Sequence, residues 1–306
     1  MKSIQPALFR SLPRGLRHAI VRTRFSLDEK RLQNVEVKVA DTEAELEASS
    51  RLLHEMYVRR GISEPHPSGL RVTPHLVLPT TATIVGLDAG KVVGTAALIQ
   101  DGPLGLPMDA IYGAELARLR AEGRRMLEVG ALCMGPEYRR TGLVYLFYKL
   151  MLHFGREQLM MDDAVCAVHP DAEDVYCAAL GFERMGPIRQ YPGLKKQAVA
   201  VALRLNMREV SERFFRRFAR WPRTVKNPRW FFEEATFPQL RLPKDALFME
   251  RRLLAVLRAA GRLGEAHPES FANLSPAHES YLWRTVPTLR RILAKSRPDL
   301  CVAANM

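Results

Sequence analysis

The residues whose types and spacing suit chemistry gather in the stretch 127–144. Positions 127–134 are mostly apolar and end at a Gly-Pro pair, a pattern typical of a buried strand. Glu128 places a carboxyl group in that strand, and Gly130 leaves a gap that indicates a bulge or a ligand close to the backbone. Because a partly buried carboxyl has a raised pKa, Glu128 is the candidate general base. The alternative is a solvent-facing carboxylate on a strand with one wet side.

A basic turn follows this strand and opens a helical run, 143–159. Guanidinium groups and the free N–H groups of a helix start together bind phosphate, and a glycine lets ligand oxygens approach the main chain. The residues predicted to bind a phosphate-bearing co-substrate are Leu132, Cys133, Met134, Arg139, Arg140, Thr141 and Gly142. The alternative is a solvated arginine pair beside an ordinary helix-start glycine.

Amine acylation is the chemistry that these groups could perform. It needs a base for the amine, a donor for the tetrahedral oxyanion and an acid for the departing thiolate. Glu128 would act as the base through a water, the backbone of 130–133 as the oxyanion donor and Tyr176 as the acid, unless Tyr176 is an ordinary core residue. Cys133 suits packing better than nucleophilic attack, since small buried cysteines are mostly inert. The residues predicted to bind substrate, which follow or lie within central strands, are Asp101, Gly130 and His169.

Strands that alternate with helices must position these groups. The strand patterns cover 35–40, 83–87, 92–100, 127–134, 164–168 and 197–205. The helical patterns cover 41–60, 109–122, 143–159 and 171–180. Thr42 followed by Glu45 is a helix-start signature, and Asp88-Ala89-Gly90 predicts a hairpin turn. The alternation predicts an α/β fold with a sheet of mixed direction and about six strands, and ligand contact at the ends of the central strands.

Length and composition exclude some classes of protein. A chain of 306 residues suits about two domains, and no uninterrupted apolar run approaches the roughly 18 residues that span a bilayer. The four cysteines form no C-x-x-C pair, which indicates reduced thiols in a cytoplasmic setting. The eight histidines show no metal-ligand spacing, so we predict no metal site and no tightly bound cofactor.

The net charge of +13 is concentrated at the two ends. Residues 1–34 carry eight Lys or Arg against two Asp or Glu, and residues 207–306 carry nineteen against ten. The first segment is basic and amphipathic, which fits either a helix packed on the body or contact with an anionic membrane. The last segment is mainly helical in pattern and interleaves arginines with aromatics, which suits membrane or carrier-protein docking, or a helical cap; nucleic acid is disfavoured because no binding motif accompanies them. We therefore divide the chain into 1–34, a central domain 35–206, and 207–306.

The central part resembles a known family. The turn at Arg139 and Gly142 is similar to the acyl-CoA-binding motif of the GCN5-related N-acyltransferase fold, although Val144 stands where that fold has a very small residue. More narrowly, 35–206 resembles the bacterial long-chain N-acyl amino acid synthases, which are similar to the N-acyl homoserine lactone (autoinducer) synthases. The segments that carry this resemblance are LLHEMYVRRG at 52–61, VGT at 93–95, DGPLGLPMD at 101–109 and GRRMLEV at 123–129.

The resemblance implies a splayed sheet and the transfer of a long acyl chain from acyl carrier protein to the α-amine of an amino acid. The co-substrate would then be acyl-4'-phosphopantetheine on the carrier, or acyl-CoA, and Val144 fits the single phosphate of a carrier better than a pyrophosphate. The family continues its strand Glu-Val-Ser-Arg, whereas this chain continues with Gly130 and Ala131. Two alternatives follow: an acetyl-CoA-dependent N-acetyltransferase, or a catalytically silent lipid- or membrane-associated protein of the same fold. We expect a cytoplasmic protein, peripheral on the inner membrane face if the basic ends bind lipid.

Overall fold

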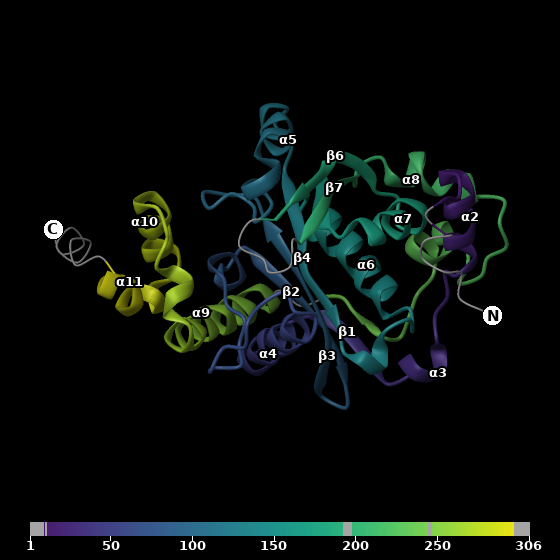
Figure 1. Ribbon diagram of the computed structural model, residues 1–306. Helices are drawn as coiled ribbons and strands as arrows, with labels where there is room; N and C mark the ends of the chain where they lie inside the picture. The colour runs from purple at the N-terminus through teal and green to yellow at the C-terminus, as the bar shows by residue number, and fades with distance from the viewer. Residues whose placement is uncertain (1–8, 10, 192–197, 244–246, 297–306) are drawn as a thin grey trace.

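A mixed eight-stranded sheet forms the centre of the molecule (Figure 1), and the computed structural model describes residues 9, 11–191, 198–243 and 247–296. The strand order is β6-β7-β5-β4-β3-β2-β1-β8. Among the described strands, β4–β5 and β1–β8 are the parallel pairs, and the other pairs are antiparallel. The strands are β1 (Val35–Val39), β2 (Thr81–Asp88), β3 (Lys91–Gln100), β4 (Met126–Met134), β5 (Asp163–Val168), β6 (Glu183–Gln190), β7 (Val199–Asn206) and β8 (Leu240–Arg241).

Alternating side chains divide the sheet between two cores, because successive residues of a strand point to opposite faces. In β2, Ile84 packs with the helices of one face and Val85 with those of the other. The first face carries α6 (Leu143–His153), α7 (Pro170–Ala179) and α2 (Arg14–Thr23). The helices α4 (Glu43–Arg59), α5 (Asp109–Ala121) and α9 (Phe248–Ala266) lie against the second face. The ribbon shows these two groups on opposite sides of the strands (Figure 1).

The parallel pair β4–β5 splays apart along its length. Pairing extends from Met126 opposite Asp163 to Glu128 opposite Val165, and the described strands are not paired beyond that point. On its other side β4 stays bonded to β3 up to Met134, and β5 stays bonded to β7 up to Val168. The two strands therefore open into a wedge that begins just past Glu128.

The basic segments at both ends pack onto this body. Helix α2 lies against α7, where the Arg17 guanidinium bonds the Asp174 carboxylate at 2.7 Å. After β7, the aromatic stretch that includes α8 (Val210–Arg213) and the turns Phe215–Phe218 and Trp230–Glu234 joins the same core. Within the residues described, no helix is both long and apolar enough to cross a membrane.

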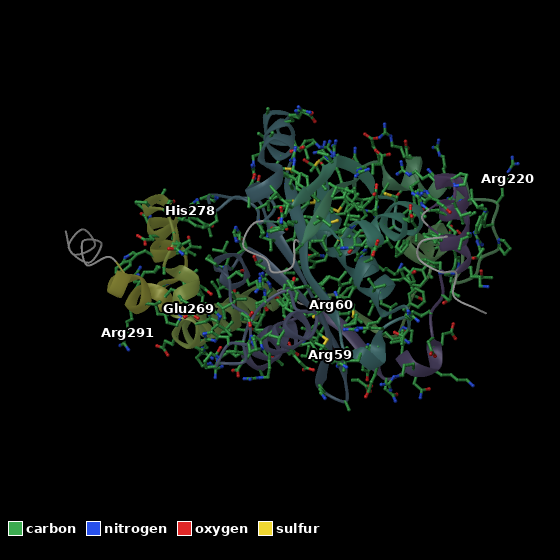
Figure 2. All side chains as sticks on the ribbon, in the orientation of Figure 1. Arg59, Arg60, Arg220, Glu269, His278 and Arg291 are labelled. Carbon is green, nitrogen blue, oxygen red and sulfur yellow. The ribbon has the colours of Figure 1, made fainter. Side chains whose placement is uncertain are left out.

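The C-terminal helices form a separate layer over α4. Helix α9 contacts α4, and it is followed by α10 (Pro276–Thr285) and α11 (Arg290–Ser296). Two short 3-10 turns, Pro268–Phe271 and Pro287–Leu289, join them. All three helices contribute to one apolar cluster with β2 and α4. Figure 2 shows Glu269 and His278 in this layer and Arg220 at the opposite end of the molecule.

The mixed, splayed α/β sheet predicted from the sequence is confirmed, and so is the hairpin, which is β2–β3. The capping signature is also present, since Thr42 Oγ1 accepts from the Glu45 N–H and Glu45 Oε2 accepts from the Asp41 N–H. The expectation of about six strands was too low, because β6 and β8 were not predicted. The helix expected over 143–159 ends at His153 and continues as a π-helical turn, Phe154–Gln158.

Candidate active site

A large cavity occupies the wedge between β4 and β5, with a volume of about 1190 Å³. The cavity reaches the turn after β4, and we call this end its mouth. Its walls come from β4, β5, α4, α7 and the loop that leads to β2. Ten of the predicted site residues line it: Glu128, Gly130, Leu132, Cys133, Met134, Arg139, Arg140, Gly142, His169 and Tyr176.

Glu128 is the buried acid of this cavity, with a relative exposure of 5%. Burial raises the pKa of its carboxyl to about 8; the hydrogen bond from the Met108 N–H to Oε2, at 2.8 Å, opposes the shift, and the charge of Asp109 adds to it. A carboxyl that ionises near neutral pH is a much stronger base than an exposed one. The alternative of a solvent-facing carboxylate is therefore wrong.

The loop before α5 holds that hydrogen-bond donor in place. Arg120 bonds both oxygens of Asp101, at 2.7 and 2.8 Å, and both oxygens of Asp109, at 2.7 and 2.6 Å. The pKa of Asp109 falls because the bonds from Arg120 and from the Leu106 N–H outweigh the effect of burial. Asp101, predicted to bind substrate, does not line the cavity; it anchors the loop that carries the Met108 N–H.

A bulge in β4 shapes the wall next to Glu128. Thr95 of β3 pairs with Cys133 and Ala97 pairs with Gly130, so one residue of β3 faces two of β4. Ala131 has a φ of 50°, in the left-handed region that non-glycine residues seldom adopt. Such a bulge turns backbone groups away from the ladder. The bulge places the backbone of residues 130–133, the predicted oxyanion donor, in the wedge, beyond the part of β4 that pairs with β5.

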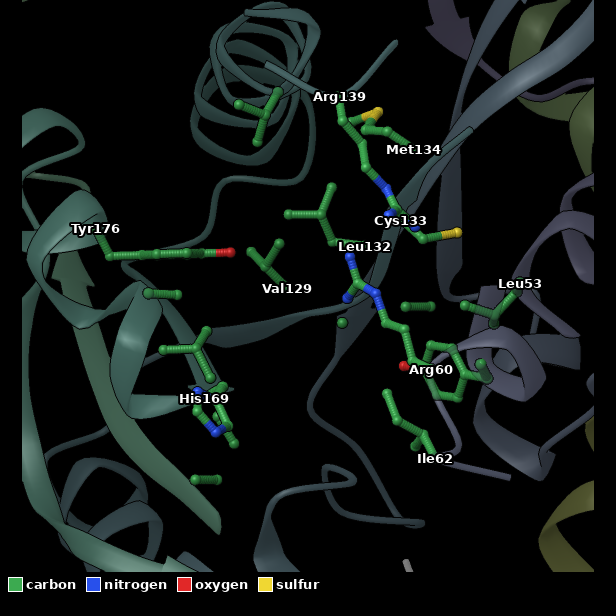
Figure 3. A pocket seen from close by; sticks show the side chains of 18 of the residues that line it. Leu53, Arg60, Ile62, Val129, Leu132, Cys133, Met134, Arg139, His169 and Tyr176 are labelled. Carbon is green, nitrogen blue, oxygen red and sulfur yellow. The ribbon is translucent and has the colours of Figure 1, made fainter. Parts of the chain in front are cut away.

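Positive charge gathers at the mouth of the cavity. Arg139 extends from the turn after β4, and Arg60 reaches in from the end of α4 (Figure 3). The charges of both guanidinium groups oppose the rise in the pKa of the Cys133 thiol. Arg140 and Arg24 also line this end. The arrangement suits an anionic group such as a phosphate.

Gly142 has a role that the sequence did not reveal. Its φ is 87°, and a Cβ there would lie 2.3 Å from the carbonyl oxygen of Ser26. The Asp28 N–H also bonds the carbonyl oxygen of Thr141 at 2.8 Å. Because Gly142 has no side chain, the N-terminal segment can pack directly against the turn after β4. That segment contributes Arg24 and Ser26 to the lining of the cavity. Thr141 does not line the cavity; it is buried, and its hydroxyl donates to the Tyr138 carbonyl oxygen.

Tyr176 and His169 lie on the β5 side of the cavity, opposite Arg60 and Arg139 (Figure 3). Burial raises the pKa of the Tyr176 hydroxyl, so it remains a proton donor across the neutral range. His169 caps α7, where its Nδ1 accepts from the Asp171 N–H at 3.2 Å. Burial also raises the pKa of the Cys133 thiol to about 12, which makes it a poor nucleophile.

Three aromatic and basic residues near Glu128 were missed in the sequence. Tyr57 of α4, Arg71 of the following loop and Tyr191 after β6 all line the cavity. The Arg71 guanidinium lies 4.6 Å from the ring centre of Tyr57, and the charge of Glu128 acts on both tyrosines. Residues of these types are common in helices and loops, so nothing in their spacing distinguished them.

A family profile described as N-acyl amino acid synthase FeeM matches residues 48–205, just over half of the chain. Among solved structures, the chain is similar to FeeM, an N-acyl amino acid synthase from uncultured soil microbes. That match has a TM-score of 0.50 and 24% identity, over 58% of this chain and 94% of that chain. The similarity confirms the predicted fold class.

Two further structures show weaker similarity. One is BjaI, a CoA-dependent acyl-homoserine lactone synthase, with a TM-score of 0.48 and 14% identity over 72% of this chain and 99% of that chain. The other is the AHL synthase LasI, with a TM-score of 0.44 and 15% identity over 56% of this chain and 89% of that chain. A search of curated proteins finds no match.

Proposed function

The chain belongs to the N-acyl amino acid synthase FeeM family and is an N-acyltransferase, and we propose that it moves a long-chain acyl group from acyl carrier protein to the amine of an amino acid. The observation that carries this proposal is a buried carboxyl, Glu128, facing a cavity of about 1190 Å³ whose mouth is lined by arginines. Pockets for drug-sized ligands occupy about 300–1,000 Å³. The cavity therefore has room for a long acyl chain and an acceptor together.

The reaction assigns one step to each group. The amine nitrogen attacks the thioester carbonyl carbon, and ionised Glu128 takes the amine proton, directly or through a water, as the C–N bond forms. Backbone N–H groups of the β4 bulge stabilise the oxyanion. The C–S bond then breaks, and Tyr176 donates its proton to the departing thiolate. A proton from Glu128 restores Tyr176 through solvent, so the chain returns to its starting state.

Arg71, Tyr57 and Tyr191 are the proposed acceptor site. A free amino acid carries a carboxylate two bonds from its amine nitrogen, and Arg71 offers a bidentate partner for it. The Tyr57 ring beneath the guanidinium fixes the orientation of that side chain. With the carboxylate on Arg71, the amine can face Glu128, whose charge acts on the same two tyrosines. This site would replace the Ser-Arg pair that Gly130 and Ala131 leave out.

The arginine-lined mouth is the proposed site for the phosphate of phosphopantetheine. Arg60 and Arg139 both lie across the cavity from β5 (Figure 3), and Arg24 and Arg140 add charge at its edge. Acyl carrier protein would dock on this basic side. We place the reaction in the cytoplasm, where carrier proteins deliver acyl groups, with the basic segments at both ends able to hold the enzyme on an anionic membrane.

A donor competition tests the assignment against its nearest alternative, an acetyl-CoA-dependent enzyme. The purified chain receives a mixture of amino acids with palmitoyl-carrier protein, palmitoyl-CoA or acetyl-CoA, and N-acyl products are measured by mass spectrometry. We expect palmitoyl products, formed fastest from the carrier-bound donor. Faster transfer from acetyl-CoA would favour the acetyltransferase, and faster transfer from palmitoyl-CoA would contradict the carrier assignment alone.

A further inference from the structure

We propose that His66, His267 and Glu269 form a binding site for a divalent transition-metal ion such as Zn²⁺. Glu269 Oε1 lies 2.6 Å from His66 Nε2 and 2.8 Å from His267 Nδ1. All three donor atoms fall within 4.8 Å of one another. The two imidazole rings stack with centroids 3.8 Å apart and an interplanar angle of 23°. Three side chains from two distant parts of the chain thus bring their donor atoms together, and the stacked rings would turn out of their stack to face a common ion.

The chemical types of these donors match zinc. Two imidazole nitrogens and one carboxylate oxygen, with water as the fourth ligand, form an open tetrahedral zinc site. Bonds of about 2.1 Å place tetrahedral donors roughly 3.4 Å apart, so the Glu269 oxygen must move about 0.6–0.8 Å from each histidine nitrogen as the rings turn toward the ion. An ion can reach the site because Glu269 is half exposed.

An outer hydrogen bond orients the His66 ring, as such bonds do around metal ligands in general. His66 Nδ1 lies 2.6 Å from Ser68 Oγ, which can accept its proton when Nε2 binds a metal. The Ser68 N–H lies 3.2 Å from the same nitrogen and favours the other tautomer without metal. Ser270 Oγ donates to the Val72 carbonyl oxygen and lies 2.9 Å from His267 Nδ1, the proposed ligand atom itself. A bound ion would therefore displace the proton that Nδ1 shares with Ser270.

The site lies where the C-terminal layer meets the rim of the catalytic cavity. His66 belongs to the loop between α4 and β2, and Ile62, Arg71 and Thr73 of that loop line the cavity. His267 and Glu269 follow α9, outside the segment that the family profile matches, and Figure 2 shows Glu269 in the C-terminal layer. A bound ion would tie the rim beside Arg71 to the C-terminal helices. The proposal does not rest on the identity of the transferase substrates.

Zinc titration of the full chain by calorimetry tests the site, with Co²⁺ absorption as a report of ligand geometry. The variants are His66→Gln, His267→Gln and Glu269→Gln. The matched control is His153→Gln, because His153 lies 2.9 Å from Glu157 and forms only a two-donor pair. We expect one equivalent of Zn²⁺ in the wild type and the control. Each ligand variant should lose more affinity than the roughly 10- to 100-fold that loss of an outer-sphere partner costs.

Melting temperatures show whether a variant that fails to bind Zn²⁺ is still folded. Zn²⁺ should raise the melting temperature of the wild type and of the control, increasingly at higher Zn²⁺ concentration, but not that of the ligand variants. Ser68→Ala keeps all three ligands and should lower the affinity by about 10- to 100-fold. The proposal is wrong if the wild type binds no equivalent of Zn²⁺ or Co²⁺, or if the three ligand variants and Ser68→Ala bind as tightly as the wild type.

Discussion

Replacing Glu128 with Gln separates the ionisation of this side chain from its packing. The amide oxygen of Gln can still accept the Met108 N–H that now bonds Glu128 Oε2 at 2.8 Å. The two side chains have nearly the same volume, so the cavity wall is preserved. What the variant removes is a carboxyl that burial holds at a pKa of about 8 instead of 4.5. We therefore expect Glu128→Gln to change stability in a way that depends on pH.

The direction of this pH dependence follows from the number of protons that the folded and the unfolded chain bind at each pH. Below pH 4.5 the carboxyl is neutral in both states, and its burial costs little. Between 4.5 and 8 the unfolded chain releases the proton while the folded chain retains it, so the free energy of unfolding falls as the pH rises. Above pH 8 both states are ionised and the full penalty remains. A shift of this size corresponds to at most about 5 kcal/mol, at roughly 1.4 kcal/mol per pH unit.

Urea unfolding at pH 5, 6, 7, 8 and 9 measures this effect. The difference in unfolding free energy between Glu128→Gln and wild type should grow with pH and level off above about 8, in favour of the variant. Acyl transfer should fall by at least about 100-fold in the same variant. Parallel stability profiles for the two proteins across this range would refute the buried, proton-binding carboxyl.

Four further predictions concern the cavity and its rim. In the wild type, kcat/KM should rise about tenfold per pH unit between 6 and 7.5 and flatten near pH 8, as Glu128 ionises. Arg139→Ala should raise KM for the carrier-bound donor more than it lowers kcat, with weaker salt dependence, because a mouth charge is lost. Arg71→Ala should raise KM for the amino acid and leave donor KM unchanged. Gly142→Ala should lower unfolding free energy by about 2–4 kcal/mol, while Gly123→Ala, where φ is also positive but a Cβ meets nothing within 4 Å, should cost about 1 kcal/mol.

Each of these has an outcome that contradicts it. A rate that keeps rising to pH 10 would assign the titration to the amine and not to Glu128. Equal changes in donor and acceptor KM for Arg71→Ala would remove Arg71 from the acceptor site, and an unchanged donor KM for Arg139→Ala would remove Arg139 from the mouth. Equal losses of stability in the two glycine variants would show that the N-terminal segment does not pack against Gly142.

Local sequence patterns predicted the strands and helices that carry the proposed catalytic groups, because the interactions that form these elements join residues close together in the sequence. The apolar strand with Glu128, the capping signature of α4 and the β2–β3 hairpin each depend on neighbours a few residues apart. Strand β6 was not predicted because Gly186 and Pro187 interrupt its sequence pattern and most of its side chains face solvent. Strand β8 was not predicted because it contains only two paired residues, and their partner strand β1 lies about two hundred residues earlier in the sequence.

The site was predicted where it follows one strand and missed where tertiary packing assembles it. The turn after β4 lines the same cavity as β4 itself. Cys133 and Arg139 therefore line the cavity, as their positions along this stretch predicted. Arg71 and Tyr191 come from separate loops that meet only when α4 and β6 pack on the sheet. Asp101 bonds the Met126 carbonyl oxygen at the start of β4 through its N–H, but its carboxylate turns to Arg120, a partner that strand spacing does not identify.

The chain's central assignment is tested most directly by mass spectrometry of lipid extracts. Cells that express the wild type are compared with cells that express equal amounts of folded Glu128→Gln. We predict a new series of long-chain N-acyl amino acids in the first extract and its loss in the second, and the masses would identify both substrates. If the abundant, folded wild-type protein produces no new N-acylated lipid, long-chain acyl transfer is contradicted.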